Sequence, residues 1–317
     1  MPAKAKTQDA SERARASRGE LTERIAHHVV EDGSVVAAPG LFLYRFSSPT
    51  GPRYGVNEPS FCVIAQGSKE VFLGKARYRY DPSHYLLVST GLPVVSHVID
   101  ASRERPYLAV RVVLDAAVVT EVLLEGGFLT SRAKGGVRAL AVSRLDASLL
   151  DPVVRLVRLV DAPSDYAVLA PLAVREIVYR LSRGEQAGQL RQIAVVGGRA
   201  HHRITQAIEL LRENRGKPLH IAGLAQRFGM SISGFHHHFK AVTAMSPLQF
   251  QKQLRLQEAR RLLLAGDVDA ATAGYRVGYD DPSHFSREYR RHFGQPPMRD
   301  VERLRGVVAR ALEPAAV

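Results

Sequence analysis

The segment from residue 218 to residue 297 contains the same pattern twice, and this repeat constrains the fold more than any other feature of the chain. The matched positions are Leu224-Ala225 and Thr272-Ala273, Phe235 and Phe285, Phe239 and Tyr289, and Pro247 and Pro297. The last three pairs are each separated by 50 residues. A pattern repeated at a fixed spacing predicts two copies of one structural unit.

Each copy predicts a short helix, a tight turn and a second helix. The alanine lets the two helices pack closely, a glycine such as Gly278 permits the turn, and Ser231 or Ser283 can cap the second helix. Aromatic residues four positions apart lie on one helix face, so that face packs inward and the opposite face is free. This arrangement is typical of a helix-turn-helix, whose second helix enters the major groove of DNA.

Basic residues are concentrated on the repeated segment. The whole chain has a formal net charge of +13. Residues 199–317 carry 19 Lys and Arg against 11 Asp and Glu, residues 21–198 carry 20 against 17, and residues 1–20 carry 5 against 3. The excess therefore lies where neutralisation of DNA phosphates requires it, although many proteins have a basic surface.

Composition excludes several other classes of protein. A single cysteine, Cys62, excludes an intramolecular disulfide framework and a cysteine-rich zinc site, which fits a cytoplasmic location. No run of about 18 apolar residues occurs, so no membrane partner is expected. Residues 1–20 are polar, lack the apolar segment of a signal peptide, and predict a disordered tail.

The N-terminal half predicts an antiparallel β-structure. Seven short segments rich in β-branched and aromatic residues are separated by turns that contain Pro and Gly. These segments are 41–46, 61–65, 69–73, 77–80, 84–88, 94–99 and 107–114. Strands at this spacing indicate a sandwich or a barrel.

Helical periods replace the strand pattern after residue 115. Helices are predicted at 116–125, at 151–160 beginning with Asp151-Pro152, and at 166–183. The third has an apolar stripe that favours packing on its own domain over a dimer seam: Ala170, Val174, Ile177, Val178 and Leu181. A long helix at 248–264 would hold the two copies of the repeat at a fixed separation.

The predicted fold class is α+β in two domains. A β-barrel with following helices occupies residues 21–185, and glycine interruptions make 186–198 a linker. An all-α domain with two helix-turn-helix motifs joined by a long helix occupies 199–301, and residues 302–317 form a C-terminal tail.

The repeat resembles the DNA-binding domain of AraC/XylS-type transcriptional regulators. The residues that carry the likeness are Leu224-Ala225, Met230-Ser231, Phe235, Phe239-Lys240, Ser246-Pro247, Arg255-Leu256, Glu258-Ala259-Arg260, Val277-Gly278-Tyr279, Ser283, Phe285, Tyr289, Phe293-Gly294 and Pro297. Two positions depart from the family pattern. Ala244 stands where the family usually has Gly, and His237 stands where its first recognition helix often has Arg.

The N-terminal half is similar to the cupin-like sensor region of one branch of this family. The likeness rests on residues 58–67, 80–88, 92–95 and 102–107. It implies that the barrel is a cupin-like domain that binds an effector. A cupin metalloenzyme would show clustered His and Glu ligands, whereas His84 and His97 stand alone in their strands.

The faces opposite the aromatic residues supply the candidates for DNA contact. Arg287, two residues after Phe285, is the leading candidate for reading a base, and Lys240 suits a phosphate. The complete set is Ser233, Gly234, His236, His237 and Lys240 in the first copy and Ser283, His284, Ser286, Arg287, Arg290 and Arg291 in the second. Some of these side chains could instead be solvated or contact phosphates only.

Other candidate residues carry weaker signals. Adjacent histidines at 236–238 diverge by about 100° on a helix, so no metal site is predicted there. Cys62 fits a buried strand position, with a sensing thiol as the sharper alternative. Arg45, Cys62, Tyr85 and His97 are candidates for effector binding, and each could equally be structural.

Together these features predict a sequence-specific transcriptional regulator that is not an enzyme and needs no cofactor. Its expected partners are double-stranded DNA, RNA polymerase and an unknown small-molecule effector, and a monomer and a homodimer both fit. Two alternatives stay open: a barrel enzyme with a DNA-targeting domain, and a non-specific architectural DNA binder.

Overall fold

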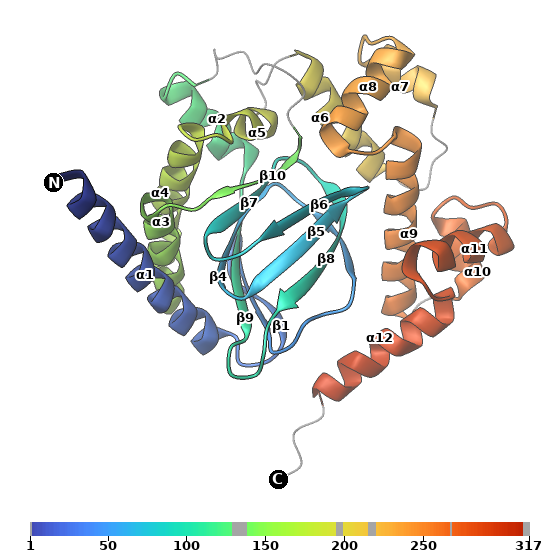
Figure 1. Cartoon of the computed structure of the whole chain (residues 1–317). Helices are drawn as coiled ribbons and strands as arrows, with labels where there is room; N and C mark the ends of the chain where they lie inside the picture. Colours follow the sequence, from blue (N-terminus) through green and yellow to red (C-terminus); the bar gives the residue numbers. More distant parts are fainter. Residues whose placement is uncertain (1, 129–137, 195–198, 215–219, 267, 313–317) are drawn as a thin grey trace. The chain divides into compact units, whose positions relative to one another are not determined.

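The chain begins with a helix, continues with strands up to residue 113 and is mostly helical after that, as the α+β prediction requires (Figure 1). The computed structural model describes residues 2–128, 138–194, 199–214, 220–266 and 268–312. The chain divides into two units, Met1–Thr205 with Ala241–Ala244, and Gln206–Lys240 with Met245–Val317. Among the described helices, none is long and apolar enough to cross a membrane.

Among the described residues of the first unit, ten strands form two antiparallel sheets. The six-stranded sheet has the order β1 (Gly33–Ala38), β2 (Leu41–Phe46), β9 (Tyr107–Val113), β4 (Ser60–Gln66), β7 (His84–Val88) and β10 (Leu140–Arg144). The four-stranded sheet has the order β3 (Arg53–Asn57), β8 (Leu92–Asp100), β5 (Ser68–Leu73) and β6 (Ala76–Tyr80). All seven predicted strands are confirmed. The prediction missed β1, β3 and β10, which lie at sheet edges and alternate weakly between apolar and polar residues.

Both faces of the six-stranded sheet are covered. Side chains alternate along each strand, so Phe61 and Val63 of β4 join the core beneath the helices while Cys62 lies on the opposite face. Arg111 of β9 is paired in register with Cys62, so it shares that opposite face. This inner face becomes the wall of a pocket inside the barrel.

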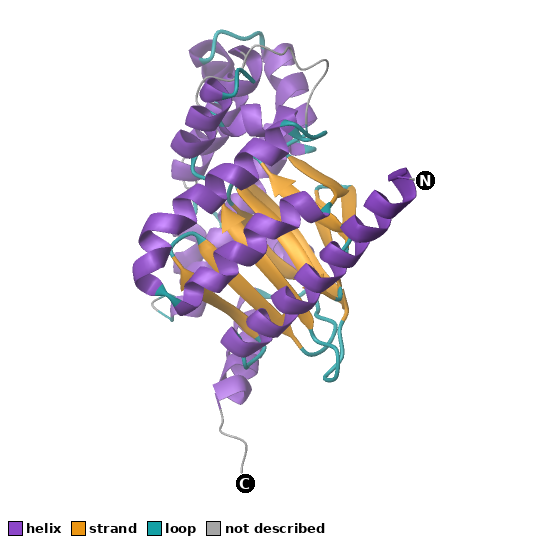
Figure 2. Cartoon of the chain, turned by 90° about the vertical axis from the view of Figure 1, so that its left-hand side faces the viewer, coloured by secondary structure: helices purple, strands orange, loops and turns teal. Residues whose placement is uncertain are grey.

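Helices cover the outer face of the six-stranded sheet, as Figure 2 shows. They are α1 (Pro2–His28), α2 (Ala116–Glu125), α3 (Ala147–Arg158) and α4 (Pro163–Ser182), with the 3-10 turn Leu159–Asp161 between the last two. The predicted stripe of α4 is confirmed as core: Ala170, Ile177, Val178 and Leu181 are buried, and Val174 packs against them.

Two sequence predictions were wrong in this layer. Residues 2–20, expected as a disordered tail, belong to helix α1, which is anchored by Leu21 and Ile25, both fully buried. Helix α3 begins at Ala147 rather than at Asp151, because Asp146 caps it through the amide of Leu149 at 2.8 Å. The apolar stripe extends back to Leu149, so tertiary packing outweighed the helix-start signal of Asp151-Pro152.

The predicted linker contains a structured helix, α5 (Ala187–Ile193), in its first half. Leu190 and Ile193 join the core of the first unit, and Ser89, the residue after β7, donates a hydrogen bond to Gln192 at 2.5 Å. Helix α5 therefore belongs to the first unit. Residues 195–198 of the predicted linker lie outside the described residues.

The second unit is built from helices. They are α6 (Arg199–Glu213), α7 (Ile221–Arg227), α8 (Ile232–Thr243), α9 (Pro247–Ala265), α10 (Ala270–Arg276), α11 (Pro282–Phe293) and α12 (Pro297–Leu312). The long helix predicted at 248–264 is confirmed as α9. The region expected as a C-terminal tail from residue 302 continues α12 as far as Leu312.

The residue after α8 has a strained backbone. Ala244 has φ of 58°, a left-handed value, at the turn where the second copy has Gly294 with φ of 83°. Such a conformation costs a residue with a Cβ about 1–2 kcal/mol.

We expect Ala244→Gly to raise the free energy of unfolding by about 0.5–1 kcal/mol. The gain is smaller than the strain that is relieved, because glycine loses more conformational entropy on folding than alanine does. Urea denaturation measures it. Gly294→Ala should show the opposite sign because of the positive φ alone, since a Cβ at this position would meet no atom within 4 Å.

Candidate nucleic-acid interface and barrel pocket

Helices α8 and α11 are the second helices of the two motifs. Phe235 and Phe239 of α8 are fully buried, and Phe239 meets Phe250 of α9 edge-to-face at 5.4 Å. Phe285 and Tyr289 of α11 are also fully buried. The aromatic faces therefore point inward as predicted, and the opposite faces are presented to solvent.

Close packing and caps fix where the two helices begin. A Cβ on Gly274 of α10 would lie 3.0 Å from the Phe285 side chain, so the glycine makes room for the close approach of α10 and α11. Ser231 caps α8 by accepting from the amide of Gly234 at 3.1 Å, as predicted. The cap of α11 is Asp281 rather than Ser283: its carboxylate accepts from the amide of Ser283 at 2.8 Å, and Pro282 occupies the first helical position.

A buried ionic network holds α11 against its neighbours. Asp300 of α12 is fully buried and accepts from Arg260 of α9 at 2.7 and 2.9 Å. It also accepts from the Tyr289 hydroxyl at 3.0 Å and from Arg303 at 2.9 Å. Burial raises the pKa of Asp300, but hydrogen bonds from Arg260 and Arg303 outweigh it, and the net pKa is lowered. This network joins the long helix, the second recognition helix and α12.

The candidate residues on α8 form a weakly basic face. Ser233, His237 and Lys240 are exposed, whereas Gly234 and His236 are half-buried. Hydroxyl and imidazole groups can donate to bases or phosphates, but Lys240 is the only residue among these five that is cationic at every physiological pH.

The candidate residues on α11 form a strongly basic face. Ser283, His284, Arg287, Arg290 and Arg291 are exposed, and Ser286 is half-buried. Arg287 lies about 200° around the helix from Phe285, so its side chain projects away from the core. Arg287 and Arg290 form no ion pair with the described residues. Arg291 instead pairs with Glu288, which also binds Lys252 at 2.7 Å, so only two of the three arginines are unengaged.

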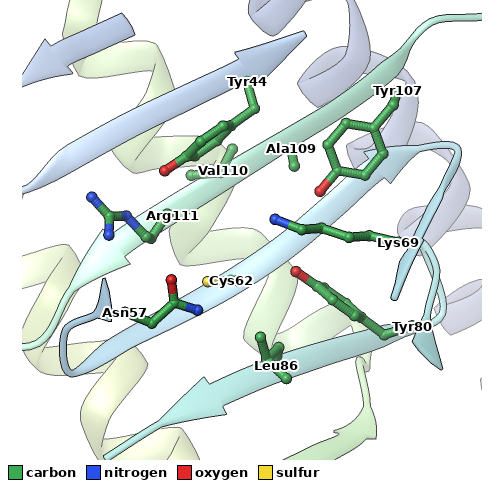
Figure 3. Close-up of a pocket in the computed structure, with 10 residues that line it drawn as sticks. All are labelled: Tyr44, Asn57, Cys62, Lys69, Tyr80, Leu86, Tyr107, Ala109, Val110 and Arg111. Atoms are coloured by element: carbon green, nitrogen blue, oxygen red, sulfur yellow. The ribbon is translucent and has the colours of Figure 1, made fainter. Parts of the chain in front are cut away.

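A pocket of about 40 Å³ lies inside the barrel (Figure 3). Its polar lining comes from Tyr44, Asn57, Cys62, Lys69, Tyr80, Tyr107 and Arg111, and its apolar lining comes from Leu86, Ala109 and Val110. Figure 3 shows the polar ends of Lys69, Tyr80 and Tyr107 pointing toward one another.

Burial controls the ionisation of the pocket groups. It raises the pKa values of Tyr80 and Tyr107 well above the usual range and lowers the pKa of Lys69 to about 8. Burial also raises the pKa of the Cys62 thiol, although the nearby Lys69 and Arg111 act in the opposite direction. At neutral pH Cys62 is therefore an un-ionised thiol, which favours its structural interpretation over a reactive sensor.

The structure brings only one of the four predicted effector residues to this pocket. Cys62 lines it, but Arg45, Tyr85 and His97 are not among the lining residues. Tyr85 lies in the core beneath the helices, 5.2 Å from the ring of Phe61, and His97 meets Phe72 edge-to-face at 5.1 Å. Sequence reasoning missed six polar lining residues: Tyr44, Asn57, Lys69, Tyr80, Tyr107 and Arg111. One sequence signal could have found Lys69: it alternates with Val71 and Leu73 along its strand, which places it on the same inward face as these buried residues.

No group of three potential metal-ligating side chains forms among the residues that the structure describes. The rings of His237 and His238 contact each other edge-to-face at 5.5 Å on α8.

Two helix-turn-helix motifs and a cupin-like barrel in one chain define a two-domain transcriptional regulator. The family described as AraC-type transcriptional regulator N-terminus matches residues 37–189, and the helix-turn-helix domain family matches residues 224–303. Together the two matches cover well over half of the sequence. The chain belongs to the AraC family of transcriptional regulators.

Curated relatives include the transcriptional activator RhaS. The chain is 28% identical to RhaS of Salmonella schwarzengrund over 167 residues, which are 52% of this chain and 58% of that protein. It is 29% identical to RhaS of Citrobacter koseri over 164 residues, which are 51% of this chain and 57% of that protein. The alignments thus span less than two thirds of the relatives.

Solved structures share the two-domain fold. An apo variant of ToxT from Vibrio cholerae has a TM-score of 0.52 at 10% identity, and the match covers 86% of this chain and 98% of ToxT. ToxT bound to (E)-4-(8-methylnaphthalen-1-yl)but-3-enoic acid has a TM-score of 0.51 at 14% identity, and the match covers 78% of this chain and 92% of ToxT.

Proposed function

We propose that the protein is a sequence-specific DNA-binding transcriptional regulator whose barrel responds to a small-molecule effector. The observation that carries the proposal is the pair of exposed helix faces on α8 and α11, each opposite a buried aromatic pair. Helices presented in this way enter successive major grooves about one helical turn apart.

The two grooves contribute unequally to binding. Arg287 and Arg290 of α11 are cationic and unengaged, whereas α8 offers Lys240, Ser233 and partly pH-dependent imidazoles. Arginine binds guanine through two parallel hydrogen bonds, which imidazole cannot reproduce. We therefore assign most of the base discrimination to α11 and a supporting role to α8.

The barrel supplies the effector response. Its pocket is lined by donors from several strands, and a protein of the same fold, ToxT, is known bound to a carboxylic acid. Helix α5, which directly precedes residues 195–198, is tied to the barrel by Gln192 on Ser89 and by Gln186 on Ser143. A ligand that shifts the barrel strands would act on this helix, and through it on DNA binding or on contact with RNA polymerase.

A mobility-shift experiment with the full-length protein tests the DNA-binding proposal. Genomic sites recovered by crosslinking are compared with scrambled versions at one salt concentration. A specific regulator prefers its sites by about 10³-fold or more, whereas an architectural binder treats both probes alike.

A further inference from the structure

The barrel contains a lysine that points toward its interior. Lys69 of β5 shares its strand face with Val71 and Leu73, which are buried, and its pocket partners include the phenols of Tyr80 and Tyr107. A charged ammonium in such surroundings is costly unless an opposite charge accompanies it. Lys69 forms no ion pair with any of the described residues.

A second cation faces the same space. Arg111 lies on the central strand β9, and its guanidinium stacks 4.0 Å from the ring centroid of Phe42. Its Nε atom is buried and has no hydrogen-bond partner among the described residues. The residues that line the pocket include no aspartate and no glutamate. The pocket therefore holds two cations without an acid to balance them. Burial is the main cause of the lowered pKa of Lys69, and the nearby Arg111 lowers it further.

We propose that this pocket binds a small carboxylate, whose charged group is held by Lys69 and Arg111 and whose short apolar part lies against Leu86, Ala109 and Val110. The inference rests on the effector role proposed for the barrel and names the chemical class of the effector. The Tyr44 hydroxyl and the Asn57 amide line the same pocket and can donate further hydrogen bonds to the carboxylate.

The volume of the pocket limits the size of this ligand. One water-sized probe occupies about 10–15 Å³, so 40 Å³ has room for about three such spheres. That space suits a carboxylate of the size of acetate. Inorganic phosphate would bring the charge but would leave the apolar wall in contact with polar oxygens, which is unfavourable.

The ionisation of Lys69 gives the proposed site a pH dependence. Burial lowers the pKa of Lys69 to about 8, and a bound carboxylate favours the charged ammonium. Binding is therefore strongest below pH 8 and weakens as the pH rises through 8, because the free protein must then take up a proton to bind.

Isothermal titration calorimetry of the full-length protein at constant ionic strength tests the proposal. The probes are sodium acetate, acetamide as its neutral isostere, and inorganic phosphate. We expect acetate to bind, acetamide to bind at least about tenfold more weakly, and Lys69→Met to weaken acetate by a similar factor. Lys75→Met, which changes an exposed lysine in the turn after β5, is the matched control and should leave acetate binding unchanged.

Several outcomes would overturn this assignment. Equal binding of acetamide and acetate, an unaffected Lys69→Met variant, phosphate bound in preference to acetate, or no acetate binding each contradicts it. Lys69→Met removes a half-buried charge that has no ion-pair partner among the described residues, so its melting temperature should not fall, and thermal denaturation confirms that the variant is folded. The mobility shift with DNA needs no ligand, so a failure to bind acetate would leave the DNA-binding proposal standing. A failure to bind DNA specifically would in turn leave the acetate titration interpretable.

Discussion

Replacing Asp300 with alanine should destabilise the second helix-turn-helix by about 3–5 kcal/mol. The substitution removes the carboxylate that accepts two hydrogen bonds from Arg260, a guanidinium that is only 9% exposed. The Tyr289 hydroxyl loses its acceptor at the same time. Urea denaturation of the full-length protein, with hydrogen exchange of the α11 amides as a local readout, measures the loss.

Asp280→Ala provides the matched control, because this aspartate is exposed in the same motif and its loss should cost no more than about 0.5 kcal/mol. Equal effects of the two substitutions would contradict the assigned role of the network. The pKa of Asp300 is lowered in the folded state, so its contribution is fully present above the ordinary carboxyl pKa. The contribution is lost as the pH falls through the lowered value.

Arg287→Ala should relax specificity at one base position and cost about 1–3 kcal/mol on the preferred site. The side chain is exposed on α11, opposite Phe285, and forms no ion pair with the described residues. Binding titrations on the site and on its single-base variants measure the effect. The preference for one base should fall while the other positions keep theirs.

Two further variants separate base reading from charge. Lys240→Ala should weaken binding to every sequence alike and reduce the salt dependence by about one counterion. Arg261→Ala removes an exposed arginine of α9 that is paired with Glu258, and it should change neither affinity nor specificity. If Arg287→Ala weakened all probes equally, its role would be limited to phosphate contact.

The sequence predicted the repeated motifs well because their determinants are local. Aromatic pairs four residues apart and the proline that starts α9 fix the helices whatever the rest of the chain does. The strands with strong β-propensity, such as β4, were also predicted. Helix α1 was missed because only Leu21, Ile25 and Val29 anchor it, and their role depends on a sheet formed far along the chain.

The pocket could not be predicted to the same extent, because the six-stranded sheet is buried on both faces. In β9, Arg111 and Val112 alternate between the barrel interior and the helix-covered face, and the sequence does not show which face is hollow. Cys62 was singled out for its chemistry and does line the pocket, whereas Tyr85 has the opposite parity on its strand from Leu86 and faces the core. Only the packing of the two sheets against each other shows which residues point into the barrel.

The most direct test of the central claim is whether two recognition helices bind one DNA site together. A recovered site is compared in a mobility shift with its scrambled version and with a version that has five base pairs inserted between the half-sites. Such an insertion turns one half-site to the opposite side of the duplex. We predict that the protein prefers the recovered site over scrambled DNA by about 10³-fold or more, and that the insertion causes a large loss of affinity. The binding that remains after the insertion should come from α11. Equal affinity for all three probes would contradict the account.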